Sequence, residues 1–493
     1  MVFSSYQFVF GFLPLAVLGY FFIDRRFGNR AGLVFLLAAS CVFYAWGEKS
    51  YLVVLIGFTT LNYFIGRQTA ALLRQHSRLA IWWTIGGIAA NLAILGYFKY
   101  TGFLIQIGNQ VFGLDLMDPR IALPLGISFF TFHALAYVIE VFRGGNAERS
   151  FVRFALFLGF FPHMVAGPIL RPKELLPQFD LPLRSRLNAD VFARGLTIFA
   201  IGLFKKSCLA DSIAPFANAT FSAAASSQPL TVLDAWAGAL AYAMQIYFDF
   251  SGYSDMAIGA ALMLGIRLPL NFDSPYKATS IIDFWRRWHM TLSRFLRDYL
   301  YFPLGGNRRG PVRRYINLLI TMGLGGLWHG ANWTFVIWGV IHGLCLCANH
   351  LWHTVRAPRH EPLSVVHIWG NRLLTFLVVV VAWVFFRAPN LETAERMVRT
   401  MFGFTAAPKL SFSAFVPPYL GMAWLAALLA IVWVMPNTQT LMEYVGLRAQ
   451  QSPSLPSTLS WQPKLSWTLA TTAFLVLSIL SMSGISEFIY FHF

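Results

Sequence analysis

Apolar stretches long enough to cross a lipid bilayer recur along this whole chain of 493 residues. The hydrocarbon layer is about 30 Å thick, and a helix needs roughly 20 apolar residues to cross it. Runs of this length match membrane-spanning helices, so the predicted fold is all-α. Because some of these runs will pair, re-enter or lie flat, we expect about eleven to thirteen crossings. The runs fall roughly at residues 6–23, 31–46, 50–66, 79–98, 121–142, 151–167, 190–204, 232–248, 252–266, 313–328, 331–350, 371–386, 417–435 and 466–483.

The composition agrees with a multi-pass membrane protein: 57% of the residues are hydrophobic and 12% are charged. No cleavable signal is expected, because the first apolar run lacks a basic segment before it and is followed by Asp24-Arg25-Arg26. By the positive-inside rule this loop is cytoplasmic and the N-terminus lies outside. The net charge of +17 then reflects topology and affinity for anionic membrane lipid, and nucleic acid is not an expected partner. Later arginines agree with this orientation at Arg67, Arg74, Arg78, Arg143, Arg149 and Arg153.

The four cysteines and the missing catalytic motifs exclude several classes of chemistry. The cysteines lie in or beside apolar runs without metal-ligand spacing, so we interpret them as packing residues and expect no metal site. The sequence has no nucleophile elbow, Walker A loop, dinucleotide fingerprint or zinc-protease motif. We therefore expect a single membrane domain over residues 1–493 with no bound cofactor.

Residues 277–314 form a basic segment that departs from the spanning pattern, with nine basic residues against Asp283 and Asp298. Its apolar side chains recur at helical spacing, which predicts one amphipathic helix in the cytoplasmic interface, with Ser280 as N-cap. His289 falls at the border of the two faces. It would either line the mouth of a cavity or simply lie in the interface. The apolar stripe comprises Ile281, Trp285, Trp288, Leu292, Phe295 and Tyr299.

The helices predicted over residues 315–350 carry His329. It lies in the stretch 323–343, which has no acidic or basic residue other than histidine. His329 lies fourteen residues after Tyr315, or about 21 Å along a helix, which is well inside the bilayer. An ionisable group there is a candidate for function, although it might only hydrogen-bond neighbouring helices. The glycines around it, at 323, 325, 326 and 330, would either border a tunnel or allow close helix packing.

Several long motifs resemble the membrane-bound O-acyltransferases (MBOAT), and within them the bacterial subgroup that O-acetylates alginate and related exopolysaccharides. The similarity extends over nearly the whole chain. The motifs are YFDFSGYSDMAIG (247–259), NFDSPYKATSIIDFWRRWHMTLSRFLRDYLYFPLGGNR (271–308), WHGANWTFVIWGVIHG (328–343), FFRAPN (385–390), MPNTQ (435–439), and the terminal segments MVFSS and FIYFHF.

The resemblance implies tilted helices, with re-entrant and interfacial ones, around a central tunnel. There a cytoplasmic donor and an extracytoplasmic acceptor reach one catalytic histidine, which matches His329; the family's second histidine matches His289. The implied donor is acetyl-CoA, and the implied partners are a periplasmic SGNH-like acetyltransferase and a polysaccharide synthesis and export complex. The location implied is the bacterial inner membrane, and the polymer would be alginate or cellulose.

Within that framework, other side chains are candidates for support. Asp249 and Asp255 would either orient a histidine or the donor, or form salt bridges, and Ser251-Gly252 between them is expected to break the helix. Trp328 and Asn332 flank His329, and Asn332 would orient the imidazole if the helix resumes there. A basic set would attract the phosphates of coenzyme A or contact lipid headgroups. It comprises Arg286, Arg287, Arg294, Arg308 and Arg309.

His329 would act either as a general base on the acceptor hydroxyl or as a nucleophile that forms an acyl-imidazole. Both roles need a neutral ring, which burial favours because it lowers the pKa of histidine. Two other functions stay open at this stage. One is transfer of D-alanine or another acyl group to a cell-wall polymer. The other is a transporter or scaffold subunit of an export complex, in which His329 would not react.

Overall fold

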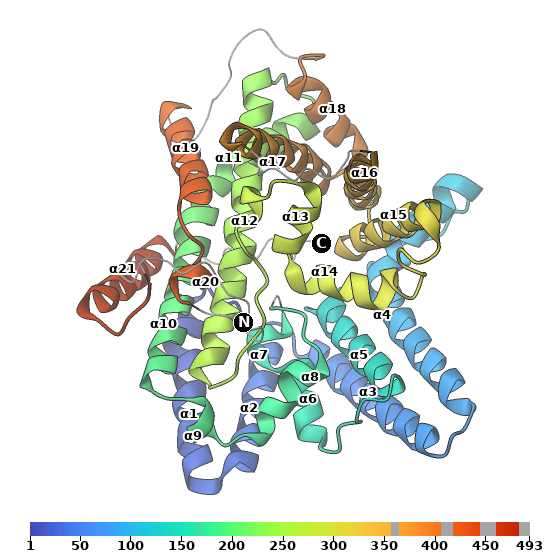
Figure 1. The fold of residues 1–493 in the computed structure, drawn as a ribbon, viewed down its shortest axis with the longest axis vertical. Coiled ribbons are helices and arrows are strands. Elements are labelled where there is room, and N and C mark those ends of the chain that lie inside the picture. The colour runs from blue at the N-terminus through green and yellow to red at the C-terminus, as the bar shows by residue number, and fades with distance from the viewer. Residues whose placement is uncertain (166, 356–363, 406–417, 444–459, 483–493) are drawn as a thin grey trace. The chain divides into compact units, whose positions relative to one another are not determined.

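The structure is a computed structural model that describes residues 1–165, 167–355, 364–405, 418–443 and 460–482. Over these residues all regular secondary structure is helical, which confirms the all-α prediction (Figure 1). The terminal FIYFHF motif, residues 488–493, lies outside the described residues.

Four helical stretches are long and apolar enough to cross a bilayer by length and composition: Gln7–Phe27, Leu79–Phe112, Trp333–Val355 and Val365–Arg387. Four shorter apolar helices accompany them at Asn29–Ala45, Ile127–Phe142, Leu420–Val434 and Leu465–Ser481. The predicted number of crossings, about eleven to thirteen, stays a prediction.

Large apolar side chains are exposed on the outer faces of these helices. Leu15, Phe22 and Trp82 are each exposed by 68–70% of their surface. Apolar faces of this extent are unfavourable in water and are expected where a helix contacts lipid. The exposed faces therefore support a multi-pass membrane protein.

The chain divides into two compact units. Unit 1 comprises Met1–Leu203, Tyr253–Leu270 and Met442–Phe491, and unit 2 comprises Phe204–Gly252, Asn271–Leu441 and His492–Phe493. The chain passes between the units several times, so neither is one continuous stretch of sequence. The single domain expected over residues 1–493 stays a prediction.

Unit 1 contains the N-terminal helices. Its α3 and α4 are joined by a buried amide pair, in which Asn62 Nδ2 donates to Asn91 Oδ1 at 2.9 Å and Asn91 Nδ2 donates to Asn62 Oδ1 at 2.8 Å. Such a reciprocal pair satisfies two polar groups within an apolar interface. The helices are η1 (Gln7–Phe12), α1 (Leu13–Phe27), α2 (Asn29–Ala45), α3 (Ser50–Arg74), α4 (Leu79–Phe112), α5 (Ile127–Phe142), α6 (Phe151–Gly159), α7 (Phe161–Met164), α8 (Pro172–Leu175), η2 (Leu176–Asp180), α9 (Leu183–Arg186), α10 (Ala189–Phe204) and α21 (Leu465–Ser481).

Unit 2 contains the segments with the two histidines of interest. Its helices are η3 (Lys205–Ala210), α11 (Asp211–Ala225), η4 (Pro275–Lys277), α13 (Ile281–Arg287), α14 (Met290–Leu296), η5 (Arg297–Tyr301), α15 (Gly310–His329), α16 (Trp333–Val355), α17 (Val365–Arg387), α18 (Leu391–Met401), α19 (Pro418–Val434) and α20 (Thr438–Leu441).

Glycines bring α15 and α16 into backbone contact. A Cβ added at Gly326 would lie 2.2 Å from the carbonyl oxygen of Phe335, and one at Gly339 would lie 2.2 Å from that of Met322. Only a residue without a side chain fits either position. Close helix packing, one of the two interpretations of these glycines, is therefore present in the structure.

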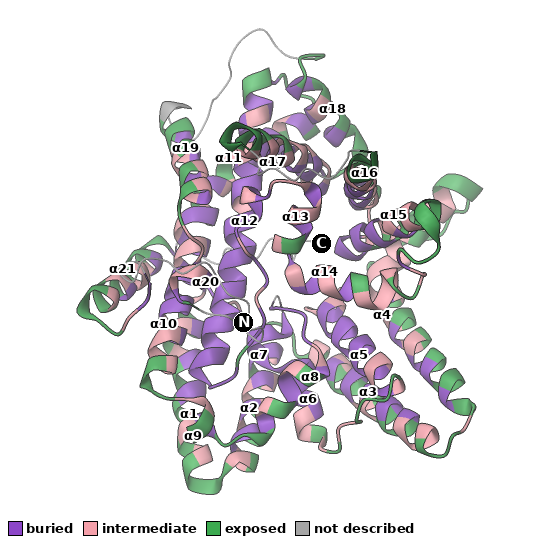
Figure 2. Ribbon diagram, viewed as in Figure 1, coloured by how far each residue is buried: buried purple, intermediate pink, exposed green. Residues whose placement is uncertain are grey.

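Helix α12 (Val232–Met263) is continuous across both units, so the break expected at Ser251-Gly252 is wrong. Both residues are buried, as is nearly the whole second half of the helix (Figure 2). Serine and glycine are weaker helix formers than alanine, but tertiary packing overrides that preference in a buried helix.

The single interfacial helix expected after Ser280 is also wrong. The N-cap is correct, since Ser280 accepts a hydrogen bond from the backbone N–H of Asp283. The helix then ends at Arg287 and α14 starts at Met290, with His289 between them in a left-handed conformation (φ 41°). The break is held by backbone pairing, because Met290 N donates to Asn271 O at 2.9 Å and Asp273 N donates to Arg287 O at 2.9 Å.

Candidate active site

His329 is the last residue of α15, and an abrupt change of backbone direction follows it. Gly330 is extended (φ −158°, ψ 146°), and α16 begins at Trp333. Because α15 runs unbroken from Gly310, the expected rise of about 21 Å from Tyr315 to His329 holds along the helix axis. The ring thus lies at the turn of a tightly packed helical hairpin.

Aromatic side chains surround His329, which is only 3% exposed. The ring centroids of Trp328, Trp338 and Phe386 lie 4.9, 5.2 and 5.2 Å from that of the imidazole. Trp338 and Phe386 meet it edge to face, at interplanar angles of 89° and 70°. This aromatic cage restricts the ring's orientation and excludes bulk water from it.

His289 is fully buried. Its Nδ1 lies 3.0 Å from Oδ1 of Asn271, which also lies 3.4 Å from the backbone N–H of Thr291. A backbone N–H can only donate, so this Asn271 atom is the oxygen and His289 Nδ1 carries the proton. In the neutral ring Nε2 then has a free lone pair. Within the described residues, this buried Nε2 has no hydrogen-bond partner.

The two predicted catalytic histidines are neighbours. Their ring centroids are 6.4 Å apart with an interplanar angle of 58°, and Trp328 lies close to both, 4.9 Å from His329 and 6.3 Å from His289. Two imidazoles at this separation can act on one small reacting group. His289 also occupies a strained backbone conformation, a feature that clusters at functional sites.

Asn332 does not orient the imidazole. Its Nδ2 donates to the carbonyl of Pro389 at 3.0 Å, and its Oδ1 accepts from the backbone N–H of Thr334 at 3.1 Å. Both polar atoms of the amide are engaged at the start of α16, so Asn332 stabilises the helix that follows the turn.

Asp249 shows the second of its two expected roles, the ion pair. Its Oδ1 lies 2.7 Å from Nζ of Lys206, and both side chains are buried, with 1% and 2% exposed. Lys206 also contacts Asp211 at 2.7 Å. Asp255 is buried in unit 1, and its supporting role stays a prediction.

The predicted donor-binding arginines divide into two groups. Arg287 is paired with Asp283, with Nε 2.9 Å from Oδ1, so its charge is already compensated. Arg286, Arg308 and Arg309 are exposed, and Arg294 is half-buried. Binding of a donor to these residues stays a prediction.

The sequence analysis missed three side chains of this region. His342 is fully buried against Trp338 and Trp285, at centroid distances of 4.9 and 5.1 Å. The available signal was that His342 follows Trp338 by four residues, which places both on the same face of a helix. Asn271, which fixes the His289 ring, and Lys206, which pairs with Asp249, had no local signal because their partners are distant in sequence.

The four cysteines are free thiols. In the part of the chain that the structure describes, no group of three or more histidine, cysteine or acidic side chains could hold a metal ion.

Several known proteins are similar to this chain in sequence. A family model of the membrane-bound O-acyltransferases (MBOAT) matches residues 129–387, which include His289 and His329. The chain is 46% identical over 410 residues to the probable alginate O-acetylase AlgI of Pseudomonas aeruginosa, covering 82% of this chain and 75% of that protein. It is 37% identical over 529 residues to a peptidoglycan O-acetyltransferase of Helicobacter pylori, covering 100% and 98% of the two chains. It is also 28% identical to a teichoic acid D-alanyltransferase of Bacillus subtilis, over 53% of this chain and 66% of that protein.

The chain belongs to the MBOAT family. It is a multi-pass membrane enzyme of the O-acyltransferase class, as the sequence motifs predicted.

Proposed function

We propose that this enzyme transfers acetyl from cytoplasmic acetyl-CoA to a hydroxyl of a polysaccharide outside the bacterial inner membrane, with its N-terminus in the periplasm. The observation that carries the proposal is the pair of buried histidines, with centroids 6.4 Å apart, inside an aromatic surrounding. The names of two relatives support the acetyl group and the carbohydrate acceptor.

In the proposed reaction His329 is the base. A ring nitrogen takes the proton from the acceptor hydroxyl as its oxygen attacks the thioester carbonyl. The C–S bond then breaks, the acetyl stays on the oxygen, and the thiolate leaves and takes up a proton from the imidazolium. In the alternative route, the ring nitrogen attacks the thioester carbonyl, the C–S bond breaks, and the thiolate leaves an acetyl-imidazole behind. The acceptor hydroxyl then attacks this acetyl group, the C–N bond breaks, and the hydroxyl proton passes to the ring nitrogen that is released.

His289 is the second ring of the proposal. Asn271 keeps the proton on Nδ1, which leaves the Nε2 lone pair of His289 to accept a hydrogen bond from a second hydroxyl of the sugar acceptor, beside the one that reacts. The indoles of Trp328 and Trp338 limit the access of water, which would otherwise hydrolyse the thioester. A tunnel that admits donor and acceptor from opposite sides belongs to this proposal.

Two polymers are candidates for the acceptor. Sequence identity favours alginate, because the chain is 46% identical to the probable alginate O-acetylase. Coverage favours peptidoglycan, because the match to the peptidoglycan O-acetyltransferase of Helicobacter spans 100% of this chain. Either could receive acetyl through a periplasmic SGNH-like partner and an associated synthesis complex. Cellulose stays a prediction of the sequence analysis, without a relative among these matches to support it.

Purified full-length protein with radiolabelled acetyl-CoA tests the proposal. Alginate oligosaccharides and soluble peptidoglycan fragments are offered separately, each with and without an extract of periplasmic proteins. We expect label in one of the two polymers and none with labelled D-alanyl thioester. Transfer of D-alanine in place of acetyl would contradict the proposed donor, and absence of label from both polymers would contradict the proposed acceptors.

A further inference from the structure

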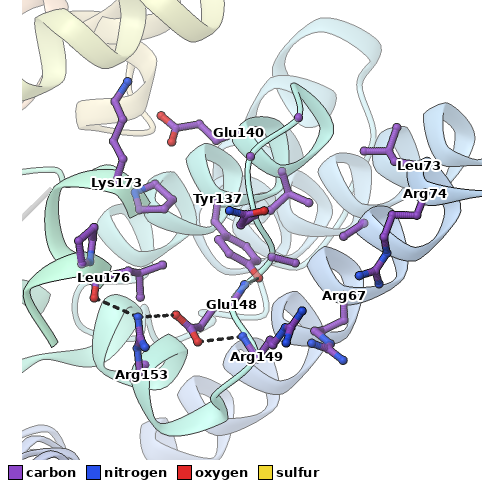
Figure 3. Close-up of a pocket in the computed structure, with 18 of the residues that line it drawn as sticks. Arg67, Leu73, Arg74, Tyr137, Glu140, Glu148, Arg149, Arg153, Lys173 and Leu176 are labelled. Atoms are coloured by element: carbon purple, nitrogen blue, oxygen red, sulfur yellow. Dashed lines mark hydrogen bonds and ion pairs between the residues drawn. The ribbon is translucent and has the colours of Figure 1, made fainter. Parts of the chain in front are cut away.

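A large pocket in unit 1 has no part in the proposed chemistry. Its volume is about 860 Å³, within the range of small-molecule sites. It is formed by the end of α3, the end of α5 with the loop 144–149, the start of α6, and the segment from α8 through η2 (Figure 3). Five basic and three acidic side chains line it: Arg67, Arg74, Arg149, Arg153, Lys173, Glu140, Glu148 and Asp180.

On one side of the pocket, the charge of Arg153 is neutralised by carboxylates of the protein itself. Arg153 contacts Glu148 at 3.1 Å, and its guanidinium also binds Asp180 through both carboxylate oxygens. A further hydrogen bond joins Arg153 to the carbonyl of Leu176 at 3.2 Å. This cluster uses two of the three carboxylates and fixes the wall formed by α6 and η2.

The other basic side chains are not neutralised by the protein. Within the described ranges, Arg67, Arg74, Arg149 and Lys173 have no side-chain ion pair or hydrogen bond. All four are exposed, and Glu140 is the one lining carboxylate outside the Arg153 cluster. In Figure 3, Arg67 and Arg74 project from α3 on one side of Tyr137, and Lys173 lies on the other.

Four positive charges around one pocket repel each other until an anion enters. Guanidinium groups bind phosphate oxygens in pairs, and a phosphate with more than one negative charge compensates several of them at once. The pocket is also at the ends of apolar helices, where the headgroups of anionic lipids gather near arginine. Leu73, Val141 and Leu176 add an apolar part to the lining.

We propose that this pocket binds a phosphate-bearing anion. The phosphate comes either from the headgroup of an anionic lipid or from a free molecule in solution, and the chemistry of recognition is the same. The inference does not depend on the proposed acetyl transfer, because it rests on residues of unit 1 alone.

Thermal unfolding of the purified full-length protein in neutral detergent separates the two sources. One arm titrates short-chain phosphatidylglycerol against phosphatidylcholine of the same chain length, and the other titrates inorganic pyrophosphate against acetate. A ligand that binds the folded state raises the unfolding midpoint in proportion to its occupancy. A shift with phosphatidylglycerol alone assigns the lipid headgroup, and a shift with pyrophosphate assigns a free phosphate.

The Arg67→Gln/Arg149→Gln variant should weaken the apparent affinity of the active ligand at least about tenfold, because it removes two charge-assisted contacts. The matched control is Arg78→Gln/Arg184→Gln, which loses the same charge at exposed positions of unit 1 outside the lining, and it should bind like the wild type. No shift in either arm, or equal weakening in both double variants, would overturn the proposal. If the first variant does not fold, Lys173→Gln provides the same comparison, with a several-fold weakening expected.

Discussion

The histidines of unit 2 lie in a surrounding of indole and phenyl rings, whereas the pocket of unit 1 is lined by exposed arginines and a lysine. His329 is 3% exposed and touches three aromatic rings, while Arg67 and Arg149 are exposed and have no carboxylate partner within the described residues. The first arrangement excludes water from a reacting group, and the second attracts ions from solution. Changes in the buried region should therefore have large effects, and changes in the exposed pocket small ones.

The largest effect is expected from His329→Gln. The variant keeps a polar side chain of similar length but cannot take the proton, so kcat for acetyl transfer should fall by about 10²–10⁴. His342→Gln is the matched control, because His342 is equally buried against Trp338 but has no proposed role in the reaction. Radiolabelled acetyl transfer measures both variants, and similar losses in the two would show that packing, not chemistry, is affected.

The buried ion pair gives the next effect. Lys206→Met leaves Asp249 buried without its partner and should cost about 3–5 kcal/mol of unfolding free energy. Removing both charges, in Lys206→Met/Asp249→Leu, should recover most of that loss. Arg67→Gln, at an exposed site, should change stability by less than about 0.5 kcal/mol. Denaturant unfolding in detergent measures all three variants. A loss of unfolding free energy well below about 3 kcal/mol in Lys206→Met would contradict the assignment of a buried, mutually dependent pair.

Two glycines of α15 sharpen the comparison further. Gly326→Ala places a Cβ 2.2 Å from the Phe335 carbonyl oxygen and should destabilise the protein by about 1–3 kcal/mol. Gly323→Ala is its control, because the nearest atom to the added Cβ is 3.9 Å away, on Val340. That variant should be neutral or more stable by up to about 1 kcal/mol, as expected for alanine in a helix. Equal effects in the unfolding curves would mean that α15 and α16 do not approach as closely as described.

The smallest effect on catalysis is expected at Asn271, which positions His289. Asn271→Ala removes the acceptor for Nδ1–H and should lower kcat about tenfold with little change in KM. Asn271→Asp keeps an oxygen at the same place and should recover most of the activity. Steady-state kinetics at several acetyl-CoA concentrations separate the two parameters. A rise in KM with an unchanged kcat would assign Asn271 to substrate binding.

The sequence predicted what depends on local pattern. The Ser280 N-cap follows from nearby residue types and is present in the structure. The break at His289 had no such signal, since the apolar periodicity continues through it and the break is held by distant backbone pairing to Asn271 and Asp273. The same holds for Ser251-Gly252, where burial in α12 outweighs the local preference.

Site residues follow the same rule. His329 and His289 were recognisable from motifs, and their proximity is a consequence of packing within unit 2. The partner of Asp249 was not predictable, because Lys206 lies 43 positions earlier and only the folded chain brings the charges within 2.7 Å. Asn332 was assigned from its sequence distance to His329, but the extended backbone at Gly330 turns α16 away from a regular helical continuation.

Vectorial transfer in proteoliposomes tests the central claim most directly. Acetyl-CoA is supplied on one side of the membrane only and the polysaccharide acceptor on the other, with wild-type protein or His329→Gln in vesicles of the same composition. The account predicts acetylated polysaccharide in the compartment opposite the donor with the wild type, and essentially none with the variant. Equal acetylation by the variant, or acetyl groups found only on the donor's side, would contradict the account.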